Sequence, residues 1–220
     1  MAVTTLNFVR HGKVENPGKV VYERLPGFHL SQLGQRQVEA SARWIAQQPQ
    51  MVKSVALYSS PLDRTMDTAH AVQRAVNQAR SAVGLQPLEI QTDTRLLEAL
   101  NIYAGQRVNH GEAAWYRHGN LFKFLNLRRP GWGEPYTHIA ERMMAFAFEK
   151  VDEHPGSNVI VVSHESPIWT LRHILETGHA SSNVLFRHTG LASVTSLSIE
   201  TGTHRLVSVS YADPARDVTA

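Results

Sequence analysis

The sequence predicts an α/β fold, a three-layer sandwich in which helices flank a mostly parallel β-sheet. Short apolar runs rich in β-favouring residues alternate with longer stretches that carry apolar residues at helical spacing. Two alternating segments joined by a Thr-Gly pair close the chain and predict an antiparallel C-terminal β-hairpin. The 220 residues, of which 42% are hydrophobic, are enough for one domain with a sizeable core. We therefore expect residues 1–220 to form a single domain.

The individual elements follow from local periodicity. Strands are expected at about 4–9, 54–58, 88–91, 158–162, 192–199 and 205–211. Helices are expected at about 31–48, 62–82, 136–153 and 166–176. Ser31 is a suitable N-cap for the first helix, and Pro49 follows its end. Strands that alternate with helices in this order indicate a mostly parallel sheet.

Two irregular segments interrupt this alternation. Residues 13–30 are too many for a plain strand-to-helix connection, and long loops in compact domains are often functional. Residues from about 101 to 135 mix aromatic and basic side chains, and we expect them to form an inserted cap. The aromatic side chains could also stack on a substrate ring, and the basic ones could contact a polyanion. A lid packed onto the body of the domain is the simpler interpretation.

Composition limits the classes of partner. A net charge of +3, from 22 Lys and Arg against 19 Asp and Glu, is too small to indicate nucleic acid by itself. The absence of cysteine excludes disulfides and thiolate chemistry, and the 12 histidines show no tight ligand spacing, so no metal or cofactor is expected. No apolar run of membrane-spanning length and no signal peptide are present, which favours a cytoplasmic protein without membrane contact. A homodimer is left open.

Polar side chains follow three of the expected strands at the point where each strand ends. Arg10 and His11 follow the first strand, Arg64 lies in the first turn of the helix after the second, and His164 follows the strand at 158–162. Parallel strands deliver their carboxyl ends to one side of a sheet, where helix N-termini add positive potential. Guanidinium forks suit phosphate especially well. The sequence therefore predicts an anion pocket, with phosphate favoured over carboxylate.

Glu98 is the fourth element of this constellation. It follows a short expected strand and adjoins the irregular cap segment. Beside an arginine-rich pocket, a carboxyl group could protonate a leaving oxygen and then activate water. The alternative is a structural salt bridge between Glu98 and a neighbouring arginine.

Several stretches, taken in order, resemble the histidine phosphatase superfamily in its phosphoglycerate mutase-like branch. They are Leu-Asn-Phe-Val-Arg10-His11-Gly12, Ser59-Ser60-Pro61-Leu-Asp-Arg64-Thr-Met-Asp-Thr-Ala, Leu97-Glu98 and Val-Val-Ser163-His164. The stretches Leu30-Ser31-Gln32-Leu33-Gly34 and Gly133-Glu134-Pro135-Tyr136 are also similar to family segments. The resemblance covers roughly residues 4 to 200; each motif alone is weak, but their order is specific.

The resemblance implies a phosphatase that acts on a small phosphorylated metabolite. His11 would attack phosphorus and become a phosphohistidine. Arg10, Arg64 and His164 would hold the phosphoryl oxygens and stabilise charge in the transition state. Glu98 would protonate the leaving oxygen and then deprotonate the attacking water. No metal is needed in this scheme, because the arginines supply positive charge.

Three positions depart from the family pattern. Lys13 stands where an acidic residue is usual, and Asn16, the match for a phosphate-binding asparagine, lies one residue closer to the histidine. Glu165 stands where a glycine is usual. A carboxylate beside phosphate would repel it unless the side chain turns away or meets a substrate cation. These departures leave the substrate preference open.

The resemblance leaves two alternatives to a hydrolase. A phosphoglycerate mutase would form the same phosphohistidine, and a non-catalytic phosphate-binding module would form none. The stretch at 99–105, which contains a glycine, looks closer to phosphatases than to the Arg-His-Tyr-Gly type sequence of the mutases. The first loop also lacks the longer mutase pattern. We therefore expect water to discharge the phosphohistidine.

Overall fold

The computed structural model describes residues 2–107, 133–180 and 188–219, and it contains one six-stranded sheet with the order β3-β2-β4-β1-β5-β6. The strands are β1 (Val3–Arg10), β2 (Ala56–Ser59), β3 (Ile90–Thr92), β4 (Asn158–Ser163), β5 (Val194–Glu200) and β6 (Leu206–Ala212). The four strands β1 to β4 pair in parallel, whereas β5 runs antiparallel to β1 and to β6. The α/β fold, the mostly parallel sheet and the C-terminal hairpin are confirmed.

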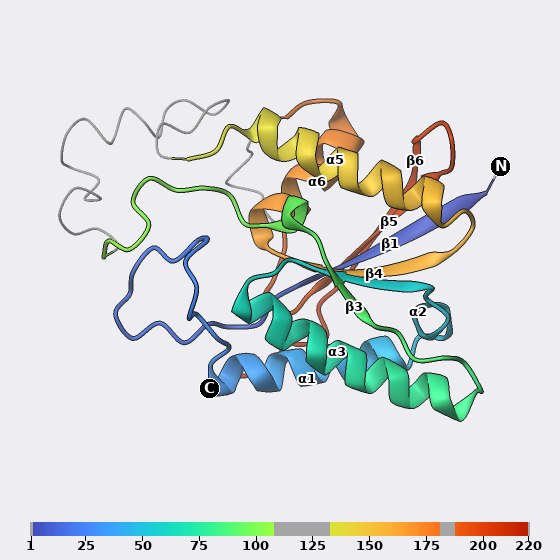
Figure 1. Ribbon diagram of the computed structural model, residues 1–220, viewed down its shortest axis with the longest axis horizontal. Helices are drawn as coiled ribbons and strands as arrows, with labels where there is room; N and C mark the ends of the chain where they lie inside the picture. The colour runs from blue at the N-terminus through green and yellow to red at the C-terminus, as the bar shows by residue number, and fades with distance from the viewer. Residues whose placement is uncertain (1, 108–132, 181–187, 220) are drawn as a thin grey trace.

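Helices cover both faces of this sheet. They are α1 (Gln32–Ala46), α2 (Pro49–Val52), α3 (Asp63–Ala82), the 3₁₀ helix η1 (Thr94–Leu96), α5 (Tyr136–Glu153) and α6 (Glu165–Thr177). Figure 1 shows α1, α2 and α3 on one side of the sheet and α5 and α6 on the other. The Ser31 hydroxyl accepts a hydrogen bond from the Gly34 N–H at 3.1 Å, as expected of an N-cap. The single turns α2 and η1 were not predicted.

The central strand β4 shows why the sheet is buried on both faces. Val159 and Val161 belong to the core beneath α5 and α6, and Ile160 and Val162 belong to the core beneath α1 and α3. Side chains alternate along a strand, so a strand covered on both faces must be apolar throughout. This explains the continuous apolar run in the sequence.

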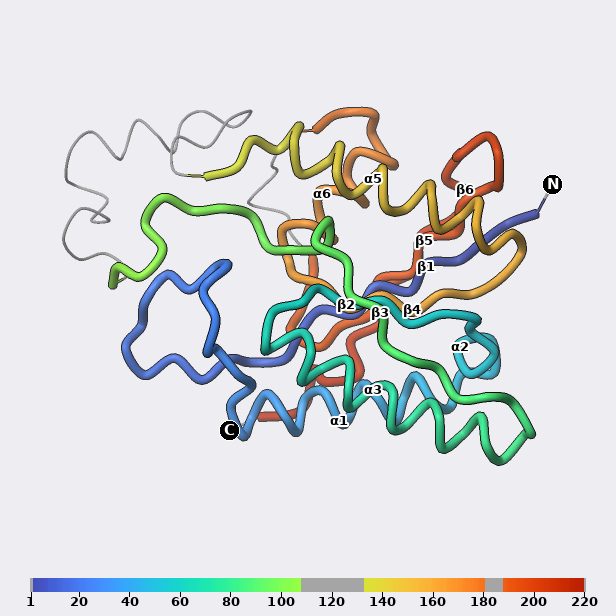
Figure 2. The backbone as a smooth tube through the Cα atoms, in the orientation of Figure 1, coloured from blue at the N-terminus to red at the C-terminus, as the bar shows by residue number. Residues whose placement is uncertain are grey.

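The carboxyl ends of β1, β2 and β4 open towards two long loops. The loop between β1 and α1 lies beside the segment after η1, as Figure 2 shows, and Val20 forms an isolated bridge with Arg107. Asn101 forms another with Gly133. Most of the cap expected at about 101–135 lies outside the described residues. The aromatic and basic side chains that lie outside them are Trp115, Tyr116, Phe122, Phe124, Trp132, Arg117, Lys123, Arg128 and Arg129. The cap, and with it the single-domain organisation, stays a prediction.

The helices of the described part of the chain are all too short or too polar to cross a membrane. The cytoplasmic location stays a prediction.

Candidate active site

Strand pairing places the two predicted histidines side by side. Arg10 at the end of β1 lies opposite Ser163 at the end of the parallel strand β4, so His11 and His164 follow in register. The His11 N–H donates to the Ser163 carbonyl at 3.2 Å, and the two imidazole centroids are 5.2 Å apart at 64°. Both side chains are buried. The convergence expected from the strand ends is therefore observed for this pair.

The His11 imidazole is held as a neutral ring in one tautomer. Its Nδ1 lies 2.8 Å from the Gly12 carbonyl, which can only accept, so Nδ1 carries the proton and Nε2 carries the lone pair. Burial, together with the charges of Arg64 and Arg10, holds the pKa of His11 well below its ordinary value. A neutral imidazole with a lone pair on Nε2 has the form that a nitrogen nucleophile needs.

His164 is also neutral, but it is arranged as a donor. Its Nε2 lies 2.9 Å from the Ser60 hydroxyl, which follows β2. With Ser60 donating, Nδ1 carries the proton, and this buried atom has no partner among the described residues. Burial, and then the Arg64 charge, lower the pKa of His164 well below its ordinary value. Ser60 belongs to the motif that begins Ser59-Ser60-Pro61, but its hydrogen bond to His164 was not predicted from the sequence.

Arg64 is buried in the first turn of α3, with only 1% of its surface exposed. Its Nη2 donates to the Glu23 carbonyl, and its guanidinium lies 4.9 Å from the centre of the Tyr22 ring. Its Nε and Nη1 have no partner in the described part of the chain, and the same holds for Arg10 Nε. Together with His164 Nδ1, these are four buried nitrogen atoms without a partner among the described residues. The three arginine nitrogens carry N–H groups, and His164 Nδ1 does so when Ser60 donates to Nε2. Buried donors without acceptors are costly, and such a cluster is suited to an anion.

We call Arg10, His11, Arg64 and His164 the anion pocket. Arg10 is its least buried member. Its Nη1 donates to the Thr189 carbonyl, and its Nη2 forms an ion pair of 2.8 Å with Glu165. The extra carboxylate that the sequence left unexplained therefore faces an arginine of the pocket itself.

Glu98 lies just after η1, and its side chain is buried. Its Oε1 accepts from the Ala99 N–H at 2.8 Å. Burial raises the pKa of Glu98 above its ordinary value, although Ala99, Arg64 and Arg10 act in the opposite direction. Among the described residues no arginine forms an ion pair with this carboxylate, so the structural salt bridge considered above is not observed. A buried carboxyl group with a raised pKa suits a general acid.

The Asn16 side chain is hydrogen-bonded within its own loop. Its Oδ1 accepts from the Val20 N–H at 3.1 Å and its Nδ2 donates to the Val20 carbonyl at 2.9 Å, so both ends of the amide close the loop on itself. It lines a surface hollow together with Lys13 and Arg36, and that hollow contains none of the other candidate residues. A phosphate-binding role for Asn16 stays a prediction.

Sequence reasoning missed a second group of ionisable side chains, which we call the Glu134 cluster: buried Glu134 together with Arg24, His138 and Arg142. The Glu134 carboxylate accepts from Arg24 Nη2 at 2.8 Å and from Arg142 Nε at 3.0 Å, and it lies 2.7 Å from His138 Nδ1. Burial alone would raise the pKa of Glu134, but Arg142 and Arg24 outweigh burial and lower it. Arg24 Nε also donates to the Glu98 carbonyl at 2.6 Å. The cluster thereby holds the segment that carries Glu98.

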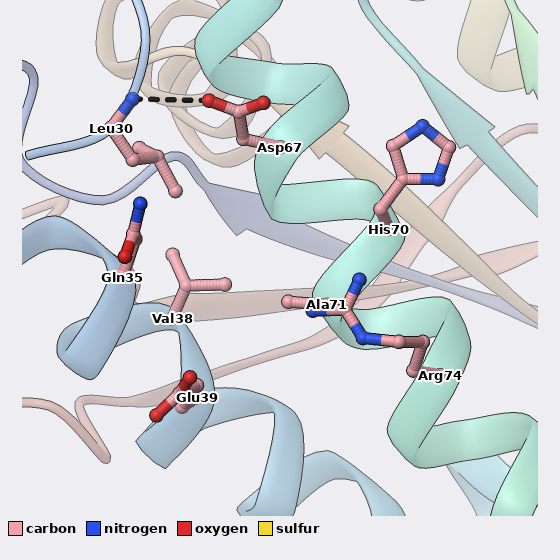
Figure 3. A pocket seen from close by; sticks show the side chains of 8 residues that line it. All are labelled: Leu30, Gln35, Val38, Glu39, Asp67, His70, Ala71 and Arg74. Carbon is pink, nitrogen blue, oxygen red and sulfur yellow. Dashed lines mark hydrogen bonds between the residues drawn. The ribbon is translucent and has the colours of Figure 1, made fainter.

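Within the described residues, no three His, Cys, Asp or Glu side chains are grouped as metal ligands would be. A separate hollow of about 330 Å³ lies between α1 and α3, and its polar lining includes Glu39, Asp67, His70 and Arg74. Figure 3 shows the Leu30 N–H bonded to the Asp67 carboxylate in this hollow. None of the residues predicted for the active site lines it.

Comparison with known proteins places the chain in a family. A family model described as "Histidine phosphatase superfamily (branch 1)" matches residues 6–212. The chain belongs to this superfamily. It is 37% identical over 212 residues to the uncharacterized protein Rv0525 of Mycobacterium tuberculosis, covering 96% of this chain and 97% of that one. It is 31% identical over 196 residues to the bifunctional protein Rv2228c of the same species, of which it spans 49%.

Solved structures share the fold at lower identity. A mycobacterial glucosyl-3-phosphoglycerate phosphatase in complex with VO3 has a TM-score of 0.73 at 23% identity, covering 94% of this chain and 96% of that one. A phosphoglycerate mutase from Bacillus anthracis has a TM-score of 0.72 at 21% identity, covering 99% and 96%. A structure described as a putative alpha-ribazole-5'-P phosphatase from Escherichia coli has a TM-score of 0.70 at 18% identity, covering 96% of each chain. At these identities the likeness concerns the fold.

Proposed function

We propose that the protein is a histidine-type phosphatase that hydrolyses a small phosphomonoester through a phosphohistidine on His11. The observation that carries this proposal is a set of four buried nitrogen atoms on Arg10, Arg64 and His164 beside a neutral His11, none of which has a partner in the part of the chain that the structure describes. All four nitrogens can donate to phosphoryl oxygens, and the His11 Nε2 lone pair can attack phosphorus. Membership of the superfamily supports the same chemistry.

The first half of the reaction transfers the phosphoryl group to the protein. The arginines and His164 Nδ1 hold the phosphoryl oxygens while His11 Nε2 forms a bond to phosphorus. The bond between phosphorus and the ester oxygen breaks in line with this attack. Glu98 gives its proton to that oxygen, and the alcohol leaves.

The second half regenerates the protein. The Glu98 carboxylate takes a proton from a water molecule, and the water oxygen attacks the phosphorus of phosphohistidine. The bond between phosphorus and Nε2 breaks, which releases inorganic phosphate and neutral His11. The positive charge that metal ions supply in other phosphoryl-transfer proteins comes from Arg10 and Arg64 in this scheme.

A phosphoglycerate mutase is the second candidate, because it would use the same phosphohistidine and a mutase shares the fold. The two differ in whether water or a second acceptor takes the phosphoryl group. The glycine-containing segment after Glu98 favours the hydrolase. A non-catalytic phosphate-binding module is less well supported, because it would need neither the lone pair on His11 nor the raised pKa of Glu98.

The test compares the wild type with His11→Ala on a panel of phosphorylated metabolites. The wild type should release inorganic phosphate from at least one of them, and His11→Ala should release none. Brief exposure to a labelled ester should leave a label on His11 that survives base and is lost in mild acid. His70→Ala, which removes an exposed histidine of α3, is the matched control and should keep full activity.

Three results would contradict the proposal. They are a label on serine or aspartate, full activity in His11→Ala, and interconversion of 3-phosphoglycerate and 2-phosphoglycerate much faster than any release of phosphate. The last result, obtained with a 2,3-bisphosphoglycerate primer, would identify a mutase instead.

A further inference from the structure

Glu165 occupies an unusual place for a carboxylate in an anion-binding site. It is the first residue of α6, directly after His164, and its Oε2 lies 2.8 Å from Arg10 Nη2. A phosphoryl group bound at Arg10 Nε would therefore share one guanidinium with a carboxylate. The Glu165 side chain is 32% exposed and that of Arg10 is 17% exposed, so the pair forms the solvent-facing rim of the pocket.

The exposure of Glu165 indicates which part of a substrate it faces. The unpartnered donors of Arg10, Arg64 and His164 are buried, whereas the Glu165 side chain is partly exposed at the rim. An ester whose phosphoryl group meets those buried donors must extend its alcohol outwards past this rim. Glu165 therefore faces the alcohol and not the phosphoryl group.

The charges of the described residues also favour a particular kind of alcohol. The pocket supplies two guanidinium groups, and one of them already pairs with Glu165. A bound phosphomonoester requires the remaining donors, on Arg64, Arg10 and His164, for its own oxygens. A second negative charge on the alcohol would meet Glu165 at close range in a partly buried site, where repulsion is stronger than in water.

We propose that Glu165 is a specificity-determining residue that disfavours phosphomonoesters whose alcohol carries a negative charge and favours those whose alcohol is neutral. This inference rests on the proposed function, and it names the substrate class. The Glu165 carboxylate acts by repelling esters whose alcohol is negatively charged, and repulsion of an unwanted ligand is a general route to specificity. The ion pair with Arg10 holds the Glu165 carboxylate at the rim of the pocket.

A matched pair of esters tests the inference. Glycerol 3-phosphate and 3-phosphoglycerate have similar size and differ in a hydroxymethyl group against a carboxylate. The wild type should prefer glycerol 3-phosphate in kcat/KM. Glu165→Gln should shift the ratio towards 3-phosphoglycerate by about tenfold, which corresponds to about 1.4 kcal/mol.

Glu176→Gln is the matched control, because it removes the same charge at the far end of the same helix, where Glu176 pairs with Arg172. It should leave the ratio unchanged. The same ratio should appear in dissociation constants measured by calorimetry for both esters on a His11→Ala background, which does not require turnover. Thermal denaturation of each variant checks that the fold is retained.

Two outcomes are distinct. If esters are bound or hydrolysed but the ratio is the same with Glu165 and with Gln at this position, the inference on specificity is wrong and the proposed function stands. If the wild type hydrolyses no phosphomonoester and the His11→Ala background binds neither ester, the proposed function and the inference both fail.

Discussion

Arg64 in the anion pocket is buried and Arg142 in the Glu134 cluster is largely buried, but their hydrogen bonding differs. All three side-chain nitrogens of Arg142 donate, two to the Glu134 carboxylate and one to the Arg95 carbonyl. Arg64 donates from Nη2 to the Glu23 carbonyl, while its Nε and Nη1 have no acceptor in the described residues. Since a buried charge normally requires full pairing, complete pairing indicates a structural role and incomplete pairing indicates a place for a ligand.

The two regions are also connected. Arg24 donates from Nη2 to Glu134 and from Nε to the Glu98 carbonyl. The Glu134 cluster thus anchors the segment that carries the proposed general acid, while the anion pocket contains the proposed nucleophile and the proposed phosphate donors. The comparison predicts that substitutions in the pocket reduce activity and that substitutions in the cluster reduce stability.

Arg64→Met should have the largest effect on activity. Removing a donor to the phosphoryl oxygens should lower kcat/KM by about 10³-fold, or about 4 kcal/mol of transition-state stabilisation. The free energy of unfolding should stay the same or rise by about 1 kcal/mol, because a buried and incompletely paired charge is removed. Steady-state kinetics and urea denaturation measure the two effects.

Arg74→Met, on the exposed face of the same helix, is the control and should change neither quantity. If Arg64→Met lowered the free energy of unfolding but left kcat/KM unchanged, Arg64 would have a structural role, and the assignment of activity to the anion pocket would be wrong.

Glu134→Gln should have the opposite profile. Removing the carboxylate leaves the partly buried Arg24 and Arg142 without their counter-charge, which should lower the free energy of unfolding by about 3 kcal/mol. At a temperature where the variant is still folded, kcat/KM should fall much less than in Arg64→Met. Thermal and urea denaturation, with exposed Glu141→Gln on α5 as the control, provide the measurement. Unchanged stability with a collapse of activity would place Glu134 in the pocket instead.

Glu98→Gln should reduce turnover of alkyl phosphates by about 10²-fold. The loss on 4-nitrophenyl phosphate should be smaller, because that leaving group needs little protonation. The pKa of Glu98 is raised, so the acid form persists above its ordinary range and is lost as the pH rises through the raised value. Wild-type turnover should therefore decline on the alkaline side, and this decline should be absent in the variant. Equal losses on both substrates would mean that Glu98 only shapes the pocket.

Treatment with EDTA should have the smallest effect, with activity essentially unchanged. The proposed chemistry takes its positive charge from Arg10 and Arg64 and its additional donor from His164. Phosphate release is measured before and after chelation, and again with added Mg²⁺, Mn²⁺ or Zn²⁺. A strict requirement for one of these ions would show that the unpaired donors alone cannot support the reaction.

Much of the fold and part of the site could be predicted from the sequence, because both depend on local patterns. The helix at Tyr136–Glu153 has the predicted bounds, since apolar spacing along a helix is a local property. Arg10, His11 and His164 converge because parallel strands in register must bring their ends together. The single turns α2 and η1 were missed because four and three residues are too few to show a period.

Tertiary structure alone decided how the side chains of the site are paired. The sequence placed a carboxylate after His164, but only the fold shows that it meets Arg10. It offered Asn16 as a phosphate ligand, which stays a prediction, but only the fold shows that both ends of that amide bond to Val20. Arg24 and Glu134 come together from distant loops. Strands and helices are encoded by repeating local patterns, but the meeting of two distant side chains depends on the path of irregular loops, for which no such pattern exists.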